Sequence, residues 1–425
     1  MGSAILFNIA RWLFLLYVAS LPLVQPFSQR FYGYLFVYSD LLFAASAGAW
    51  LLSAITGKVQ LRGHRVFGWV GVFLIAMTLA ALVSEDPGRS FLKLGGVYYL
   101  AAIGWLAFNL AEDTTFLQLI IFAWLAGTAL TVLGAFLGVA GYYAGFDTTS
   151  SNRFLFHFGS LPTGNYPRID SFFDNANMMA NYLNVSVVIA LAAGAAGWIS
   201  QKRSFAFVLL FIGASIFTFS AGIGGIILSI AIFLALGPFR HHGTKRIAVL
   251  LGGVFLGVLA FASTLISPVQ RDDHHKISIP ILNVQFEPSV RVVVWANVLQ
   301  RGAEFPFLGR GTGTDAANVQ YTVVSGQTQI LRDAHQAWLN IFGQAGLIGV
   351  VAFTLLCWRI LRCCKFDPGH GTQAEWLRFG LSAAFVGAFL FQNLFGSFED
   401  ARHLWVLIGL LPAAQILVGA NQVQD

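Results

Sequence analysis

The sequence predicts an all-α, polytopic integral membrane protein with about twelve transmembrane helices, because most of it is apolar and few of its residues are charged. Of its 425 residues, 57% are hydrophobic and only 10% are charged, and the mean hydropathy is +0.71. Soluble proteins are about one quarter charged, so a water-soluble globule is excluded. The net charge of +6 is scattered between hydrophobic runs. It is not gathered on one soluble face, so no nucleic-acid partner is expected.

Twelve apolar runs of about 20 residues are long enough to cross a hydrocarbon core of roughly 30 Å as helices. We expect spans at residues 4–23, 31–55, 66–84, 91–110, 115–141, 177–198, 205–221, 222–236, 247–266, 335–360, 376–395 and 403–418. Small residues between Ser220 and Gly225 permit a tight or re-entrant turn between the seventh and eighth spans. The chain, residues 1–425, is expected to form a single membrane domain.

The distribution of cations predicts the orientation of the chain. If the N-terminus is inside, the short inner loops hold twelve lysines and arginines and the short outer loops hold four. This satisfies the positive-inside rule and places both termini in the cytoplasm. The first span lacks a basic leader and a cleavage site, so we expect it to be retained. The three cysteines at residues 357–364 then lie on the reducing side, and no disulfide framework is implied.

Two outer segments, residues 142–175 and 267–334, are too long to be simple connectors, and we expect short surface helices in the second. Long outer segments escape the charge rule, yet these two carry eight basic residues: Arg153, Arg168, Arg271, Lys276, Arg291, Arg301, Arg310 and Arg332. Arginine binds phosphate groups through paired hydrogen bonds, so the cluster indicates an anionic ligand such as a phosphate or diphosphate. Alternatively, these cations contact lipid headgroups or pair with acidic residues of the same segments.

Residues 288–295 predict a surface helix whose first turn contains Pro288. Arg291 and Trp295 are four residues apart and share one face, and we expect Trp295 to anchor the helix in the headgroup region. The following glycine-rich stretch, residues 305–313, lets the backbone approach a ligand or forms a plain loop.

Asp333 is a plausible N-cap for the tenth span, which places His335 in the first helical turn at the outer boundary. A helix N-terminus disfavours a protonated imidazole, so a neutral His335 can serve as a general base. A structural role for this histidine is the alternative. Residues 272–275, Asp-Asp-His-His, lack regular ligand spacing, so we expect no metal site.

The order of these motifs resembles the O-antigen ligase and polymerase superfamily. The resemblance rests on Arg291-x-x-x-Trp295, on Pro306-x-x-Gly309-x-Gly311, and on His335-x-x-x-Leu339 followed by Gly346-Leu347-Ile348-Gly349. A second match runs from Arg168 to Leu183 at the entry to the sixth span, where Ala176 replaces the usual proline.

The resemblance implies a metal-independent, cofactor-free, inverting glycosyltransferase in the bacterial inner membrane with a periplasmic active site. As an O-antigen ligase in lipopolysaccharide biosynthesis, it would transfer a glycan from undecaprenyl diphosphate to a sugar of the lipid A core. Besides these substrates, the expected partners are membrane lipids.

The implied catalytic residues are His335 as the base and Arg291 with Arg168 as a diphosphate clamp. Arg310 and Arg332 are further candidates for binding the donor diphosphate, and the candidates for substrate binding are Asn177, Trp295 and Gln336. Many relatives carry an arginine after the serine that closes the seventh span, whereas this chain has Ala221 after Ser220. Arg168 or another outer cation must therefore substitute for it.

Other functions remain open on this sequence. An O-antigen or exopolysaccharide polymerase would use nearly the same donor site, and a protein O-oligosaccharyltransferase would differ only in its acceptor. A glycolipid transporter is the alternative from another class, because Arg11, Asp40 and Lys93 fall near or within spans. We find no internal repeat of the kind typical of transporters, and we favour the ligase because its outer segments are compact and the second ends in the His335 motif.

Overall fold

The computed structural model describes residues 2–31, 34–57, 61–145, 157–161, 164–267, 277–279, 284–322, 328–369, 371–396 and 401–421. Its helices are α1 (Gly2–Ser20), α2 (Ser39–Ile55), α3 (Arg65–Leu82), α4 (Pro87–Leu110), α5 (Thr114–Tyr143), α6 (Ala176–Ala195), α7 (Gln201–Ile216), α8 (Ile223–Leu236), α9 (Gly243–Leu265), α10 (Val290–Gly302), α11 (Ala337–Leu361), α12 (Gln373–Phe395) and α13 (Arg402–Asn421). The strands are β1 (Ser28–Phe31), β2 (Tyr34–Val37), β3 (His157–Leu161), β4 (Gly164–Arg168), β5 (Ile266–Ser267), β6 (Ile277–Ile279), β7 (Val284–Pro288), β8 (Val319–Thr322) and β9 (Thr328–Leu331).

The helices confirm a polytopic membrane protein. Within the described ranges, eight helices are long and apolar enough to cross a membrane: α3, α4, α5, α6, α9, α11, α12 and α13. Shorter apolar helices occur in α1, α2 and α8, and α7 has 16 residues. A helix falls at each of the twelve expected positions. Whether all twelve cross the membrane depends on these four shorter helices, so the count of twelve spans stays a prediction.

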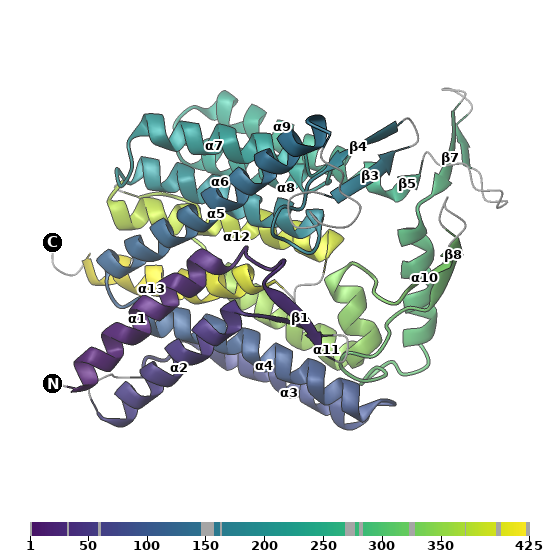
Figure 1. Ribbon diagram of the computed structural model, residues 1–425, viewed down its shortest axis with the longest axis horizontal. Helices are drawn as coiled ribbons and strands as arrows, with labels where there is room; N and C mark the ends of the chain where they lie inside the picture. The colour runs from purple at the N-terminus through teal and green to yellow at the C-terminus, as the bar shows by residue number, and fades with distance from the viewer. Residues whose placement is uncertain are drawn as a thin grey trace.

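The two ends of the helix bundle differ in character. The N- and C-termini lie together at one end, and the short antiparallel hairpins and α10 lie at the other (Figure 1). We call these the terminal end and the hairpin end. This arrangement agrees with the expectation that both termini lie on one side of the membrane and both long polar segments on the other.

Helix α6 lies at the centre of the bundle and α9 at its edge. Of the apolar window of α6, 83% is buried, against 6% for α9. Alanine and glycine let α9 approach α8 closely, since a Cβ on Gly253 would overlap Ala231. The rest of α9 presents large aliphatic residues outward, which lipid chains would solvate.

The second expected span, residues 31–55, begins too early. Residues Tyr34–Val37 form strand β2, which pairs with β1, and α2 starts only at Ser39. Aromatic and β-branched residues such as Phe36 and Val37 favour strands as much as apolar helices. The prediction was wrong here because hydropathy alone does not distinguish the two.

Helix α11 is not the single straight span that its apolar run predicts. Gly346 has the non-helical angles φ 59° and ψ −158° and separates two helical pieces, residues 337–345 and 347–361. The chain reverses so sharply there that Trp338 Nε1 donates to Thr354 Oγ1 over 3.2 Å, although the two residues are 16 positions apart.

The glycine-rich stretch, residues 305–313, fills this break. Backbone N–H groups of Leu347 and Ile348 donate to the carbonyls of Pro306 and Phe307. In return, the backbone N–H of Gly311 donates to the carbonyl of Gln344. Irregular backbone within a membrane protein must be satisfied by such partners, so these glycines approach protein backbone instead of the ligand that the sequence allowed.

Replacing Gly346 by alanine is expected to reduce the yield of monodisperse protein in detergent several-fold. A Cβ at this position would overlap the Phe307 backbone, and the positive φ is strained for any other residue. Size-exclusion chromatography of the solubilised protein measures the effect. Gly252→Ala is the control, because nothing lies within 4 Å of a Cβ there, and equal yields for both variants would contradict the prediction.

Candidate active site at the hairpin end

Helix α10 carries Arg291 in its first turn. Ser289 is its N-cap, with the hydroxyl accepting from the backbone N–H of Arg291 over 3.3 Å. Pro288, which we expected inside the first turn, is instead the last residue of β7 and pairs with Ile266. A serine caps better than a proline because its oxygen binds an N–H group that the helix leaves without a partner.

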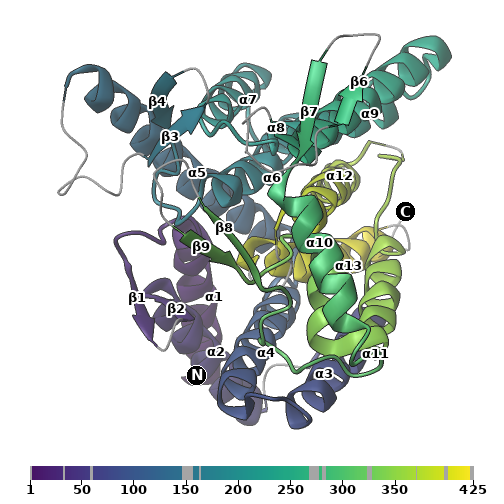
Figure 2. The ribbon, with the colours of Figure 1, turned by 90° about the vertical axis from the view of Figure 1, so that its right-hand side faces the viewer.

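Helix α10 lies at the hairpin end (Figure 2), and one of its faces is buried. Val294 and Val298 are buried against Ala316, Ala317 and Ala334, and burying two valines contributes about 3 to 5 kcal/mol. On the same face, Trp295 Nε1 donates to the carbonyl oxygen of Ala334 over 2.9 Å. The structure thus gives this indole a protein partner, where we had expected a headgroup anchor.

Arg168 lies at the end of β4 and reaches the link between α7 and α8. Its Nε donates to the Thr218 carbonyl over 3.0 Å, and its Nη2 donates to Asn177 Oδ1 over 3.3 Å. The Ser220 hydroxyl donates to the same Asn177 oxygen over 2.7 Å. Ser220 is the serine after which the resemblance led us to expect an arginine, and Arg168 brings a guanidinium to that link from another segment.

The charges of Arg168 and Arg291 act on each other. Burial lowers the pKa of the Arg291 guanidinium, and the positive charge of Arg168 lowers it further. Both remain cationic, since arginine does not lose its proton in proteins. Two half-buried guanidiniums within electrostatic range of each other raise the local positive potential. The fold therefore places two of the predicted site residues, from segments far apart in the sequence, within electrostatic range of each other.

His335 directly precedes α11, and its imidazole side chain is 46% exposed. The N-cap is Gln336, whose Oε1 accepts from the Leu339 backbone N–H over 2.6 Å. Our expectation that Asp333 caps the helix and that His335 occupies its first turn was wrong by three residues. Gln336, a predicted substrate-binding residue, therefore also starts the helix.

The other predicted diphosphate ligands are engaged by carboxylates. Arg310 Nε lies 3.2 Å from Glu85 Oε2, and its Nη2 lies 3.6 Å from Glu304. Arg332 Nε lies 3.5 Å from Asp315. A phosphate would have to compete with these carboxylates for either guanidinium. Several residues singled out in the sequence lie outside the described ranges: Arg153, Arg271, Lys276 and the run 272–275.

Asp170 follows Arg168 closely in sequence and is 9% exposed. Burial raises the pKa of its carboxyl to about 7. A backbone hydrogen bond lowers this pKa in part. The negative charge of Asp174 raises it and the positive charge of Arg168 lowers it. Up to that pH the carboxyl of Asp170 is protonated and adds no negative charge beside Arg168.

Thermal stability is expected to fall as the pH rises from about 4 towards about 7 on account of Asp170. In that window the native state holds a proton that the unfolded state, with the ordinary pKa of 3.8, has released, and stability falls with pH wherever the native state binds more protons. Unfolding temperatures in detergent at several pH values measure the slope. An Asp170→Asn variant should show a flatter slope, and an unchanged slope would contradict the assignment.

A buried polar cluster below the site was missed in the sequence. Asn181 Nδ2 donates to Gln392 Oε1 over 2.7 Å and lies 3.2 Å from His403 Nε2. All three residues are at most 6% exposed. Asn177 and Asn181, one helical turn apart in an apolar run, were a usable signal, because polar groups inside membranes are costly and often functional.

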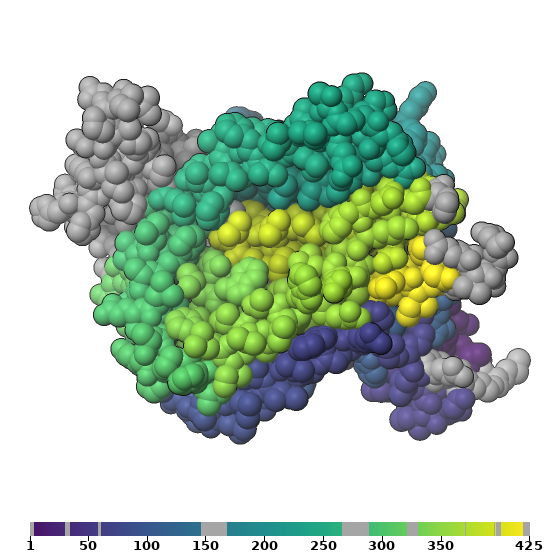
Figure 3. Space-filling view, turned by 180° about the vertical axis from the view of Figure 1, so that it is seen from behind, coloured from purple at the N-terminus to yellow at the C-terminus, as the bar shows by residue number. Residues whose placement is uncertain are grey.

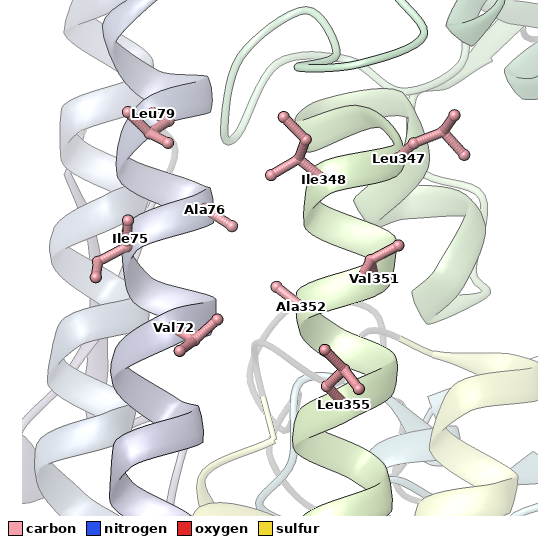
Figure 4. Close-up of a pocket in the computed structure, with 9 residues that line it drawn as sticks. All are labelled: Val72, Ile75, Ala76, Leu79, Leu347, Ile348, Val351, Ala352 and Leu355. Carbon is pink, nitrogen blue, oxygen red and sulfur yellow. The ribbon is translucent and has the colours of Figure 1, made fainter.

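An apolar groove lies between α3 and α11 (Figure 4). It has a volume of about 370 Å³ and is lined by Val72, Ile75, Ala76, Leu79, Leu347, Ile348, Val351, Ala352 and Leu355. These side chains carry no polar group, so the groove supplies no catalytic chemistry. Seen from behind, the surface is also hollowed between α9 and α11, beside α10 (Figure 3).

Comparison with known proteins gives one match. Residues 205–354 match the family described as O-Antigen ligase. This region contains Arg291, His335 and the break at Gly346, whereas Arg168 and Asn177 precede it. No curated protein and no solved structure matches the chain significantly. The chain is therefore a multi-pass membrane protein that carries an O-antigen ligase family domain at residues 205–354.

Proposed function

We propose that the protein is an O-antigen ligase. It transfers a glycan from undecaprenyl diphosphate to a sugar hydroxyl of the lipid A core, at the periplasmic face of the bacterial inner membrane. The observation that supports the proposal is the placement of Arg168 and Arg291 at the hairpin end, near enough that the charge of Arg168 lowers the pKa of Arg291, on the side opposite both termini. The predicted orientation makes that side periplasmic.

The arginine pair suits the departure of a diphosphate. As the bond between the anomeric carbon and the diphosphate oxygen breaks, its electron pair leaves with the diphosphate, which gains negative charge. Two guanidiniums in a partly dehydrated site stabilise that charge through two-pronged hydrogen bonds. They supply the positive charge for this step, and the proposed mechanism is accordingly metal-independent.

His335 suits the attack by the acceptor. The acceptor hydroxyl oxygen forms the new bond to the anomeric carbon, and its proton passes to the imidazole. Attack from the face opposite the diphosphate inverts the configuration. The hydrogen bond between Trp295 and Ala334 supports this arrangement, because it fixes the residue before His335 against α10, one turn from Arg291.

The acceptor distinguishes the ligase from its alternatives, and deletion of the gene in the native host identifies it. A ligase deletion is expected to leave bare lipid A core and to accumulate long glycans on the carrier lipid. A core bearing one repeat would indicate a polymerase, and unchanged lipopolysaccharide would indicate another acceptor, such as a protein or an exopolysaccharide.

Purified protein in liposomes tests the enzymatic claim itself. With an undecaprenyl-diphosphate-linked glycan and lipid A core as the only additions, product is expected to form. Movement of the donor lipid across the bilayer without product would instead favour a transporter.

A further inference from the structure

The backbone of His335 is held in an uncommon conformation. Its φ is +49°, in the left-handed region that residues other than glycine seldom adopt. The Asp333 carboxylate stabilises this conformation, since its Oδ1 accepts from the His335 backbone N–H over 2.5 Å. Strained backbone of this kind persists only when its surroundings hold it, and it gathers at functional sites.

A second residue, Asn340, holds Asp333 in place. Its Nδ2 donates to the same Asp333 Oδ1 over 2.7 Å, and its Oδ1 accepts from the Ala334 backbone N–H over 2.8 Å. Asn340 is fully buried in the second turn of α11. The segment before the helix is therefore tied at two points to a rigid element.

The carboxylate also faces the imidazole ring. Asp333 Oδ1 lies 3.8 Å from His335 Nδ1, which is beyond a normal hydrogen bond but within strong electrostatic range. The elements that pack here carry further charged side chains: Arg291 and Arg301 on α10, Arg332 before Asp333, and Asp315, which lies 3.5 Å from Arg332. Of the two carboxylates, Asp333 is the one that faces the imidazole.

We propose that Asp333, held by Asn340, is a positioning residue that turns the His335 ring so that Nδ1 faces the carboxylate and Nε2 faces the acceptor. When Nε2 accepts the hydroxyl proton, the carboxylate stabilises the resulting imidazolium and is not itself protonated. This inference rests on the proposed role of His335 as the base.

Asp333→Asn tests the charge separately from the shape. The asparagine oxygen still accepts from the His335 N–H and from Asn340, so the variant should unfold at the wild-type temperature. Its kcat for glycan transfer is expected to fall about tenfold or more with an unchanged KM for the donor. The split between kcat and KM separates this role from a merely structural one, because a loosened segment would also weaken binding of the donor.

Asp86→Asn is the matched control. It removes a carboxylate at the same end of the bundle, where Asp86 caps α4, and asparagine caps equally well. It should change neither kcat nor KM. Asn340→Ala removes the two hydrogen bonds of the Asn340 side chain to Asp333 and Ala334. It is expected to lower kcat, and it tests the proposal independently if Asp333→Asn expresses poorly.

The outcomes separate the two proposals. Wild-type kcat in Asp333→Asn, or wild-type kcat in Asn340→Ala, overturns the positioning role. If His335→Ala keeps full activity, the proposed base itself is wrong. If His335→Ala is inactive while Asp333→Asn behaves as wild type, only the role of Asp333 is lost.

Discussion

Replacing Arg291 by alanine is expected to lower the rate of glycan transfer about 10²- to 10³-fold, the usual cost of losing one donor that stabilises a developing negative charge. The guanidinium is half-buried at the start of α10, and the charge of Arg168 acts on it; the proposed function assigns it to the donor diphosphate. Initial rates in liposomes with a lipid-linked donor measure the loss.

The control for Arg291 lies on the same helix. Arg301 is in the last turn of α10, and its replacement by alanine should leave the rate within a few-fold of wild type. Arg291→Lys should recover only part of the rate, because lysine keeps the charge but not the two-pronged donor geometry. An Arg291→Ala protein as active as Arg301→Ala would remove the diphosphate clamp from the proposal.

Replacing His335 by alanine is expected to lower the rate about 10²- to 10⁴-fold, the range for loss of a general base. Binding of the donor lipid should be retained, because the arginines remain. A His335→Gln variant should be equally slow, since an amide can form hydrogen bonds but does not accept the proton.

The matched control is His242→Ala at the terminal end, where the side chain is exposed. It should retain wild-type activity. If His335→Ala loses donor binding together with its rate, then His335 acts on the donor and another group serves as the base.

The positions of the helices could be predicted from the sequence because hydropathy measures the main driving force for their insertion, the transfer of apolar residues into lipid. The exceptions are local. Residues 34–37 form a strand because aromatic and β-branched residues suit either structure. Gly346 breaks α11 because the loop at Phe307 occupies the space beside it, and that loop is distant in sequence.

Candidate site residues could be named from the sequence, and their roles stay predictions, but their geometry could not be derived from it. Arg291 and His335 were found by motif, and Arg168 by the need for a cation near Ser220. Their relation depends on contacts between distant segments, such as that of Arg168 with Thr218. The left-handed backbone of His335 had no signal of its own, since it arises from the hydrogen bonds of Asp333 and Asn340.

The most direct test is an electron cryomicroscopy map of the protein in a lipid nanodisc with undecaprenyl diphosphate bound. We expect density for the two phosphates within hydrogen-bond distance of the Arg291 and Arg168 guanidiniums, with the His335 ring turned towards the same space. Diphosphate density at Arg310 and Arg332 instead, with Arg168 and Arg291 untouched, would contradict the account.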